Sequence, residues 1–186
     1  MGFAGDNYVF SEIPDMKKLF HKVRVDEIEV GDTLCVIITD PMTNKFVLDY
    51  KKVEHIMLTK GSMDVVLIGD TKITKNHPIL IQYKTWHQPF EMSQSYINTP
   101  TDMYSFAFEK TEHGRPVAVL LNDNLHACTL AHGLTDNVIE HDFYGTERVI
   151  NWLGEYVKTF SSSLNPKTGV VDITNSGPKS EQPPKK

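Results

Sequence analysis

Thr74 and His77 are the residues of this chain whose types and spacing best fit chemistry on an amide bond. They stand in Thr74-Lys75-Asn76-His77-Pro78, between two apolar runs that favour strands. A hydroxyl can orient or polarise a carbonyl group, and an imidazole can give or take a proton near neutral pH. A Thr-x-x-His pattern is also typical of an ordinary turn, so its function depends on what the rest of the chain brings to it.

The length and composition predict one soluble globular domain with a hydrophobic core. The chain has 186 residues, 40% of them hydrophobic and 23% charged, and a net charge of -5. That charge argues against a general nucleic-acid partner. No apolar segment approaches the ~20 residues that a membrane span requires, and the N-terminus lacks a signal-peptide core. We therefore expect a cytoplasmic monomer with no membrane span.

The cysteines and histidines do not form a metal-binding pattern. Two cysteines, Cys35 and Cys128, cannot make a disulfide framework, and neither belongs to a Cys-x-x-Cys pair. We expect both to be reduced core residues, with a reactive thiol as the alternative. The histidines lack a His-x-x-x-His anchor, so we expect no metal, and no cofactor loop is visible.

Short runs of alternating or apolar residues, separated by turn residues, predict a mainly β fold. The clearest strands are expected at 33–39 and 103–109, with a hairpin around Asn122-Asp123-Asn124. The near-alternating stretch from Val25 to Asp32 is expected to be an amphipathic strand. Residues 83–101 show no clear period and are expected to be a packed loop.

One convincing helix follows the strands. Thr146 can cap its N-terminus, and Glu147 suits the positive end of a helix dipole. The apolar residues that then fall on one face are Val149, Ile150, Leu153, Tyr156, Val157 and Phe160. We expect residues 1–133 to form the β core, residues 134–160 to be an extension with this helix packed on the core, and residues 161–186 to be a mostly disordered tail.

Four motifs in order resemble the Hint domain, the hedgehog/intein autoprocessing fold. The family opens with a Cys, an aromatic residue and a small-Gly-Asp turn, continues with an amphipathic strand ending in Gly-Asp, then has Thr-x-x-His, and ends with a strand and a hairpin closed by His-Asn. The matching segments are Gly2-Phe3-Ala4-Gly5-Asp6, Val25 to Asp32, Thr74 with His77, Met103-Tyr104-Ser105-Phe106, and Leu130-Ala131-His132-Gly133.

Within that superfamily the chain most resembles the Hint domains attached to von Willebrand A-type proteins, with bacterial-intein-like domains as near neighbours. The residues that carry this resemblance are His77-Pro78, Trp86, Pro89, Tyr104-Ser105-Phe106, Cys128-Thr129-Leu130-Ala131-His132-Gly133 and Tyr144-Gly145-Thr146. The resemblance spans about residues 2–155. It implies a horseshoe-like β disk with the helix as an appended element.

The resemblance also implies an activity in cis. In the family, a Cys thiol attacks the carbonyl of the preceding residue and converts an amide into a thioester. His77 would give a proton to the departing nitrogen, and Thr74 would hold or polarise the scissile carbonyl. His132 would assist a final cyclising Asn. The partner is the chain's own N-terminal flanking polypeptide, for which a ubiquitin-like or von Willebrand A-type domain is the implied candidate.

Two positions depart from the family plan. Gly2 stands where the nucleophilic Cys is expected, and Gly133 stands where the cyclising Asn is expected. Neither glycine can do that chemistry, so we expect no splicing and, as written, no processing at the N-terminus. Ser105 replaces the Asp or Cys usual in the fourth motif, and Asp102 and Cys128 are further secondary candidates.

These departures leave two main functions open. The first is a single-turnover self-processing domain, if a Cys is native at position 2. The second is a catalytically silent Hint domain that serves as an interaction or structural module. A small zinc or hydrolase β domain has only the scattered histidines in its favour. Position 2 discriminates between the first two, and we favour an engineered Gly2 over a native one.

Overall fold

The computed structural model describes residues 2–13 and 16–174, and over these residues the chain is mainly β, as predicted. The described strands form one sheet of 14 strands. They are β1 (Phe3–Ala4), β2 (Tyr8–Ile13), β3 (Met16–Arg24), β4 (Thr33–Thr39), β5 (Phe46–Thr59), β6 (Ser62–Ile68), β7 (Thr71–Thr74), β8 (Ile79–Ile81), β9 (Thr85–His87), β10 (Tyr96–Pro100), β11 (Met103–Phe108), β12 (Ala118–Leu120), β13 (His126–Cys128) and β14 (Val170–Asp172).

Helices are few in this described part of the chain. They are the α-helices α1 (Pro89–Met92) and α2 (Glu147–Thr159) and the 3-10 turns η1 (Val25–Glu27), η2 (Asn122–Asn124) and η3 (Ser161–Ser163). None of the helices in the described ranges is long and apolar enough to cross a membrane.

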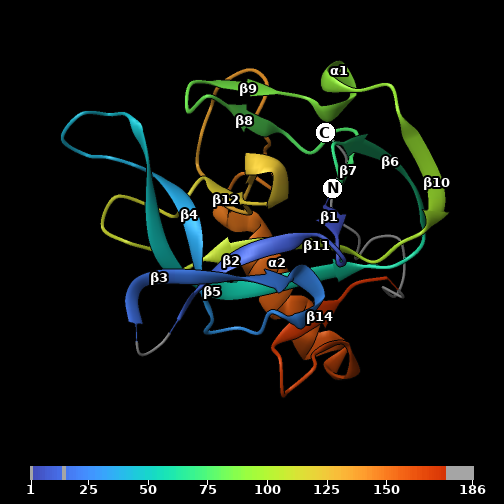
Figure 1. Ribbon diagram of the computed structural model, residues 1–186. Coiled ribbons are helices and arrows are strands. Elements are labelled where there is room, and N and C mark those ends of the chain that lie inside the picture. Colours follow the sequence, from blue (N-terminus) through green and yellow to red (C-terminus); the bar gives the residue numbers. More distant parts are fainter. Residues whose placement is uncertain (1, 14–15, 175–186) are drawn as a thin grey trace.

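The sheet curls so that its two ends approach each other. The strand order runs β10-β6-β7-β1-β11-β5-β4-β12-β13-β8-β9, which places β9 and β10 at opposite ends. Only the short helix α1 and its flanking residues separate these two strands in the sequence. Figure 1 shows β9 passing through α1 into β10 on one side of the molecule. This curvature brings the start of the chain and the last hairpin toward the Thr74–His77 turn.

The chain start is held inside the sheet. β1 lies between β7 and β11, with Phe3 paired to Ile73 on one side and to Tyr104 on the other. A strand of two residues contributes little pairing of its own, so burial must hold it. Phe3 and Ala4 are fully buried, and the Phe3 ring packs edge-on against Phe106 at 5.4 Å between centroids.

The predicted C-terminal helix is present. The Thr146 hydroxyl accepts a hydrogen bond from the Arg148 backbone N–H at 3.4 Å, which caps α2 as its sequence suggests. Val149, Leu153 and Tyr156 are buried, in a cluster with Met57 of β5 and Ala107 of β11. Figure 1 shows α2 lying against this part of the sheet.

Three local expectations differ from the structure. Residues 83–101 contain β9, α1 and β10, because β9 pairs with β8 and β10 pairs with β6 despite their weak periodicity. Val25 begins the 3-10 turn η1 rather than an amphipathic strand. Residues 161–174, expected to belong to a mostly disordered tail, contain η3 and β14 instead, and β14 pairs in parallel with β5. Residues 175–186 lie outside the described residues.

Leu153→Ala tests how tightly α2 is packed on the sheet. Leu153 is 1% exposed, so removing its side chain should leave a cavity and lower the free energy of unfolding by about 2–5 kcal/mol. Glu155→Ala is the matched control, since its exposed ion pair with Lys158 should contribute no more than about 0.5 kcal/mol. Denaturant unfolding measures both. Equal effects of the two substitutions would show that α2 is not packed as described.

Candidate functional site

Thr74 binds the backbone of residue 2 from two sides. Its hydroxyl oxygen accepts a hydrogen bond from the Gly2 N–H at 3.1 Å and lies 3.1 Å from the Gly2 carbonyl oxygen, to which it can donate. The Thr74 backbone N–H also donates to the Gly2 carbonyl oxygen at 2.9 Å. Thr74 is 8% exposed, so these bonds are shielded from water. The amide nitrogen of residue 2 is therefore held at a fixed place beside the Thr-x-x-His turn.

Residue 2 has a conformation and surroundings that suit glycine. Gly2 has φ +152°, a region that residues with a side chain rarely adopt. A Cβ atom at this position would lie 3.0 Å from the Met103 Cβ and 3.1 Å from the Tyr104 carbonyl oxygen. A larger residue at position 2 therefore requires a small shift of β1 or β11.

His77 is fully buried and its orientation is fixed. Its Nε2 lies 2.8 Å from the Cys128 carbonyl oxygen, and a carbonyl only accepts, so Nε2 carries the proton. The Phe3 ring packs against the imidazole at 5.5 Å between centroids. The other ring nitrogen, Nδ1, is buried and has no hydrogen-bond partner among the described residues. A buried nitrogen without a hydrogen-bond partner is costly, and it therefore needs an explanation in the function or in the structure.

Burial sets the charge of both ionisable groups in this part of the site. Burial lowers the pKa of His77 to about 3, because the charged ring would lose its water shell. The hydrogen bond to the Cys128 carbonyl oxygen raises this pKa, and His132 lowers it, but burial is the largest cause. Burial raises the pKa of the Cys128 thiol to about 12. His77 is therefore neutral at pH 7, and Cys128 is an unreactive thiol.

His132 lies four residues after the end of β13 and is 6% exposed. Its Nδ1 accepts a hydrogen bond from the Leu134 backbone N–H at 2.9 Å. His132 and Gly133 line a cavity of about 560 Å³ together with Arg115 and Val117. His132 is close enough to His77 to lower the pKa of that ring.

The secondary candidates differ in burial and in their contacts; they are Ser105, Asp102, Gly133 and Cys128. Ser105 is buried on β11, one residue before Phe106. Asp102 has an exposed side chain, and its backbone carbonyl accepts from the Gly5 N–H at 3.0 Å. Gly133 is exposed with φ +74°, and nothing lies within 4 Å of a Cβ built there. Cys128 contributes its backbone carbonyl to His77 rather than its sulfur.

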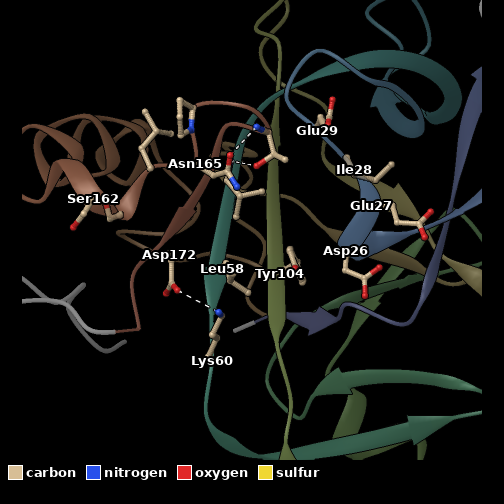
Figure 2. Close-up of a pocket in the computed structure, with 15 residues that line it drawn as sticks. Asp26, Glu27, Ile28, Glu29, Leu58, Lys60, Tyr104, Ser162, Asn165 and Asp172 are labelled. Carbon is tan, nitrogen blue, oxygen red and sulfur yellow. Dashed lines mark hydrogen bonds and ion pairs between the residues drawn. The ribbon is translucent and has the colours of Figure 1, made fainter.

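A separate groove lies next to β5 and β11. Figure 2 shows it between η1 and the segment that leads into β14, with Leu58 and Tyr104 on the strands behind it and an ion pair of 3.8 Å between Lys60 and Asp172. Its volume is about 730 Å³. Burial and the charges of Asp102, Asp26 and Asp172 raise the pKa of Tyr104 to about 12. Gly2, Thr74, His77 and His132 are not among the residues that line it.

Metal-binding chemistry finds no support in the described ranges. Within residues 2–13 and 16–174, no group of three or more His, Cys, Asp or Glu side chains is placed to hold an ion.

Sequence reasoning missed several groups that shape this site. The Phe3 ring, the Cys128 carbonyl oxygen and Gly145, which lies against His132, all contact a candidate residue. The segment Tyr144-Gly145-Thr146 was noticed as part of the family pattern, but its place beside His132 depends on long-range folding.

Comparison with known proteins identifies the family. A family model described as a Hint-domain, with the short name Vint, matches residues 11–172. Position 2 lies before the matched residues. No curated protein matches the chain.

Two solved structures are similar at low sequence identity. The bacterial intein-like domain from Clostridium thermocellum is 15% identical, with a TM-score of 0.49 over 69% of this chain and 97% of that one. A DnaB intein from Synechocystis sp. PCC 6803 is 14% identical, with a TM-score of 0.48 over 69% of this chain and 99% of that one. Because the family model covers most of its length, the chain belongs to the Hint-domain family, which supports an autoprocessing-type domain in general.

Proposed function

We propose that this Hint domain processes its own N-terminal junction when a Cys occupies position 2, and that it is catalytically silent with Gly2. The observation that carries the proposal is the fixed amide of residue 2, bound to Thr74 near a buried neutral His77. The substrate is the polypeptide that precedes residue 2 in the same chain. A ubiquitin-like or von Willebrand A-type domain is the implied partner.

The proposed reaction begins with a proton transfer to His77. Its Nε2–H donates a hydrogen bond to the Cys128 carbonyl oxygen, so the lone pair on Nδ1 is the available base. A thiol at position 2 gives its proton to Nδ1, and the sulfur then attacks the carbonyl carbon of residue 1. His77 thus has to receive a proton before it can act as an acid, because burial keeps the ring neutral beforehand.

The second half of the step breaks the amide. The bond between the residue 1 carbonyl carbon and the residue 2 nitrogen breaks, and that nitrogen takes the proton from His77. The product is a thioester at residue 2 with a free amine. The Thr74 hydroxyl, which contacts the N–H of the scissile amide, holds this nitrogen in place. Its contacts favour a role at the nitrogen over the expected role at the scissile carbonyl.

With Gly2 in place, we regard the chain as a catalytically silent module. Gly2 has no nucleophile, and its φ of +152° together with the close Met103 Cβ suits glycine better than cysteine. Gly133 cannot cyclise, so neither the entry step nor a C-terminal cleavage is available. A role as an interaction or structural module follows if Gly2 is native.

Gly2→Cys, placed behind a folded partner that ends in Gly, should restore thioester formation. The partner should be released by a strong thiol or hydroxylamine, since a thioester is a better electrophile than an amide. Mass spectrometry of the released fragments measures this. Gly2→Ala is the matched control, because it adds the same Cβ and backbone strain without the sulfur, and it should release nothing.

The same assay separates the roles of the site residues. In the Gly2→Cys protein, His77→Ala should slow release by about 10²–10⁴-fold, as for loss of a positioned acid–base group. Thr74→Ala should cost less, because its hydroxyl holds the nitrogen and transfers no proton. No variant should be cleaved after Gly133. A folded Gly2→Cys protein that never forms a thioester would refute the processing function and leave the silent module.

The low pKa of His77 predicts a pH dependence of stability. The unfolded chain binds a proton on this ring below about 6.5, whereas the folded chain does so only near the lowered pKa of about 3. The contribution of His77 is therefore complete above pH 6.5 and is lost as the pH falls toward 3, at up to about 1.4 kcal/mol per pH unit.

A comparison with His77→Gln isolates this effect from the other ionisable groups. The Gln side chain keeps an amide N–H for the Cys128 carbonyl oxygen but does not titrate. Its free energy of unfolding should fall less steeply than that of the unsubstituted protein between pH 6.5 and pH 4, as measured by denaturant unfolding. Parallel curves would show that His77 takes up protons in the folded state.

A further inference from the structure

The segment that follows the β core binds the backbone on both sides of His132. The Ala131 N–H donates to the Tyr144 carbonyl oxygen at 2.7 Å, and the Gly133 N–H donates to the Gly145 carbonyl oxygen at 2.8 Å. Ala131 has φ +57°, which turns the chain so that both N–H groups face this segment. The backbone around His132 is therefore held by residues outside the expected β core.

The backbone of Gly145 lies directly against the His132 imidazole. A Cβ atom at residue 145 would lie 2.9 Å from the His132 Cε1, 3.1 Å from its Nε2 and 2.8 Å from the His141 carbonyl oxygen. Two of these distances are shorter than real Cβ contacts, and one involves the backbone, which cannot rotate away. Only glycine fits at this position without moving the ring or the turn.

The hydrogen bond from Leu134 decides which nitrogen of His132 carries the proton. A backbone N–H only donates, so the Nδ1 that accepts from Leu134 at 2.9 Å must present its lone pair. In the neutral ring the proton is then on Nε2, the nitrogen next to Gly145. Neutral His132 in this arrangement is a hydrogen-bond donor at Nε2 and has no lone pair there to accept a proton.

The 141–145 turn is itself fixed by local hydrogen bonds. The His141 Nδ1 accepts from the Phe143 and Tyr144 backbone N–H groups at 3.1 and 3.0 Å. The Gly145 N–H donates to the His141 carbonyl oxygen at 3.1 Å. Thr146 then caps α2, so the position of Gly145 follows the position of the helix start.

Arg115 ties the helix start to the sheet. Its guanidinium donates to both carboxylate oxygens of Glu147, at 2.9 and 3.0 Å, and to the Phe108 carbonyl oxygen at 2.7 Å. A further bond of 3.0 Å reaches Glu54 on β5. The Arg115 side chain is only 6% exposed, and its hydrogen bond lowers the pKa of the Glu147 carboxyl. The Glu147 carboxylate is 45% exposed, but two parallel hydrogen bonds to a buried guanidinium fix orientation better than a single-contact surface ion pair.

We propose that residues 141–147, held by Arg115, contribute to the chemistry of the site. Gly145 and Arg115 are positioning residues that keep the proton of the neutral His132 ring on Nε2, where the ring is a hydrogen-bond donor. The use of that donor rests on the proposed function: it would stabilise negative charge on a carbonyl oxygen during acyl transfer, and it would not take a proton from the attacking group. The C-terminal extension is then required for chemistry as well as for stability.

The tautomer of His132 can be measured on the unsubstituted protein, so the result does not depend on processing activity. Nitrogen-15 NMR of the histidine side chains, at a pH where His132 is neutral, should show its proton on Nε2 in a single tautomer. A proton on Nδ1, or a rapidly exchanging mixture of tautomers, would overturn the proposal. Assignment through His132→Gln identifies the resonances.

Gly145→Ala and Gly154→Ala form a matched pair for the positioning role. Gly145→Ala should shift the His132 nitrogen resonances, because the added methyl group displaces the ring. Gly154→Ala should leave them unchanged, since nothing lies within 4 Å of a Cβ at that helical position. Unchanged His132 resonances in a folded Gly145→Ala protein would contradict the positioning role.

Arg115→Lys and Arg115→Met give a milder test if Gly145→Ala fails to fold. Arg115→Met should lower the fraction of neutral His132 that has its proton on Nε2. Arg115→Lys retains the charge but not the two-pronged geometry, so it should lower this fraction less. In the Gly2→Cys background, Gly145→Ala should slow release of the partner by about 10²-fold, as expected for a misplaced group. If His132 has its proton on Nε2 but the Gly2→Cys protein shows no processing, the proposed function alone is rejected. If a folded Gly2→Cys protein that also carries Gly145→Ala is processed at the normal rate, the positioning role is rejected.

Discussion

The buried hydrogen bond between the His77 Nε2 and the Cys128 carbonyl oxygen is the interaction on which the rest of the site depends. It joins the Thr-x-x-His turn to the last hairpin, which are distant in sequence, and it fixes which ring nitrogen carries the proton. The remaining nitrogen is left buried without a partner among the described residues, at a cost of about 1–3 kcal/mol. The Phe3 ring and the paired strands around β1 must hold the imidazole against that cost.

Exclusion of water then decides what each group can do. The same burial that keeps His77 neutral also keeps the Cys128 thiol protonated, so proximity to the site does not make Cys128 a nucleophile. Thr74 acts through its hydroxyl and its backbone on residue 2, and it needs no charge. The site is thus built from buried groups that hold no charge at His77 or Cys128 near pH 7.

The parts of this molecule that could be predicted from sequence are those set by local patterns. α2 was predicted because its cap and apolar face are local. Thr74 and His77 could be singled out because three residues of spacing place them in one turn, and their chemical roles stay predictions. β14 could not be predicted, because its three residues become a strand only by pairing with β5. The contact of Gly145 with His132 was missed for a similar reason. A glycine that leaves space for a distant ring resembles any loop glycine until the fold is known.

The geometry of the site is maintained by bonds that stabilise the fold whether or not chemistry occurs. Thr74 bonds to the backbone of residue 2, His77 bonds to a backbone carbonyl, and the neighbours of His132 bond to residues 144–145. None of these contacts uses a side chain at position 2, so a nucleophile can be absent while the site stays assembled. The side chain at position 2 therefore separates a self-processing domain from a silent one within the same site. That distinction depends on one side chain, and on whether β1 can accommodate it between β7 and β11.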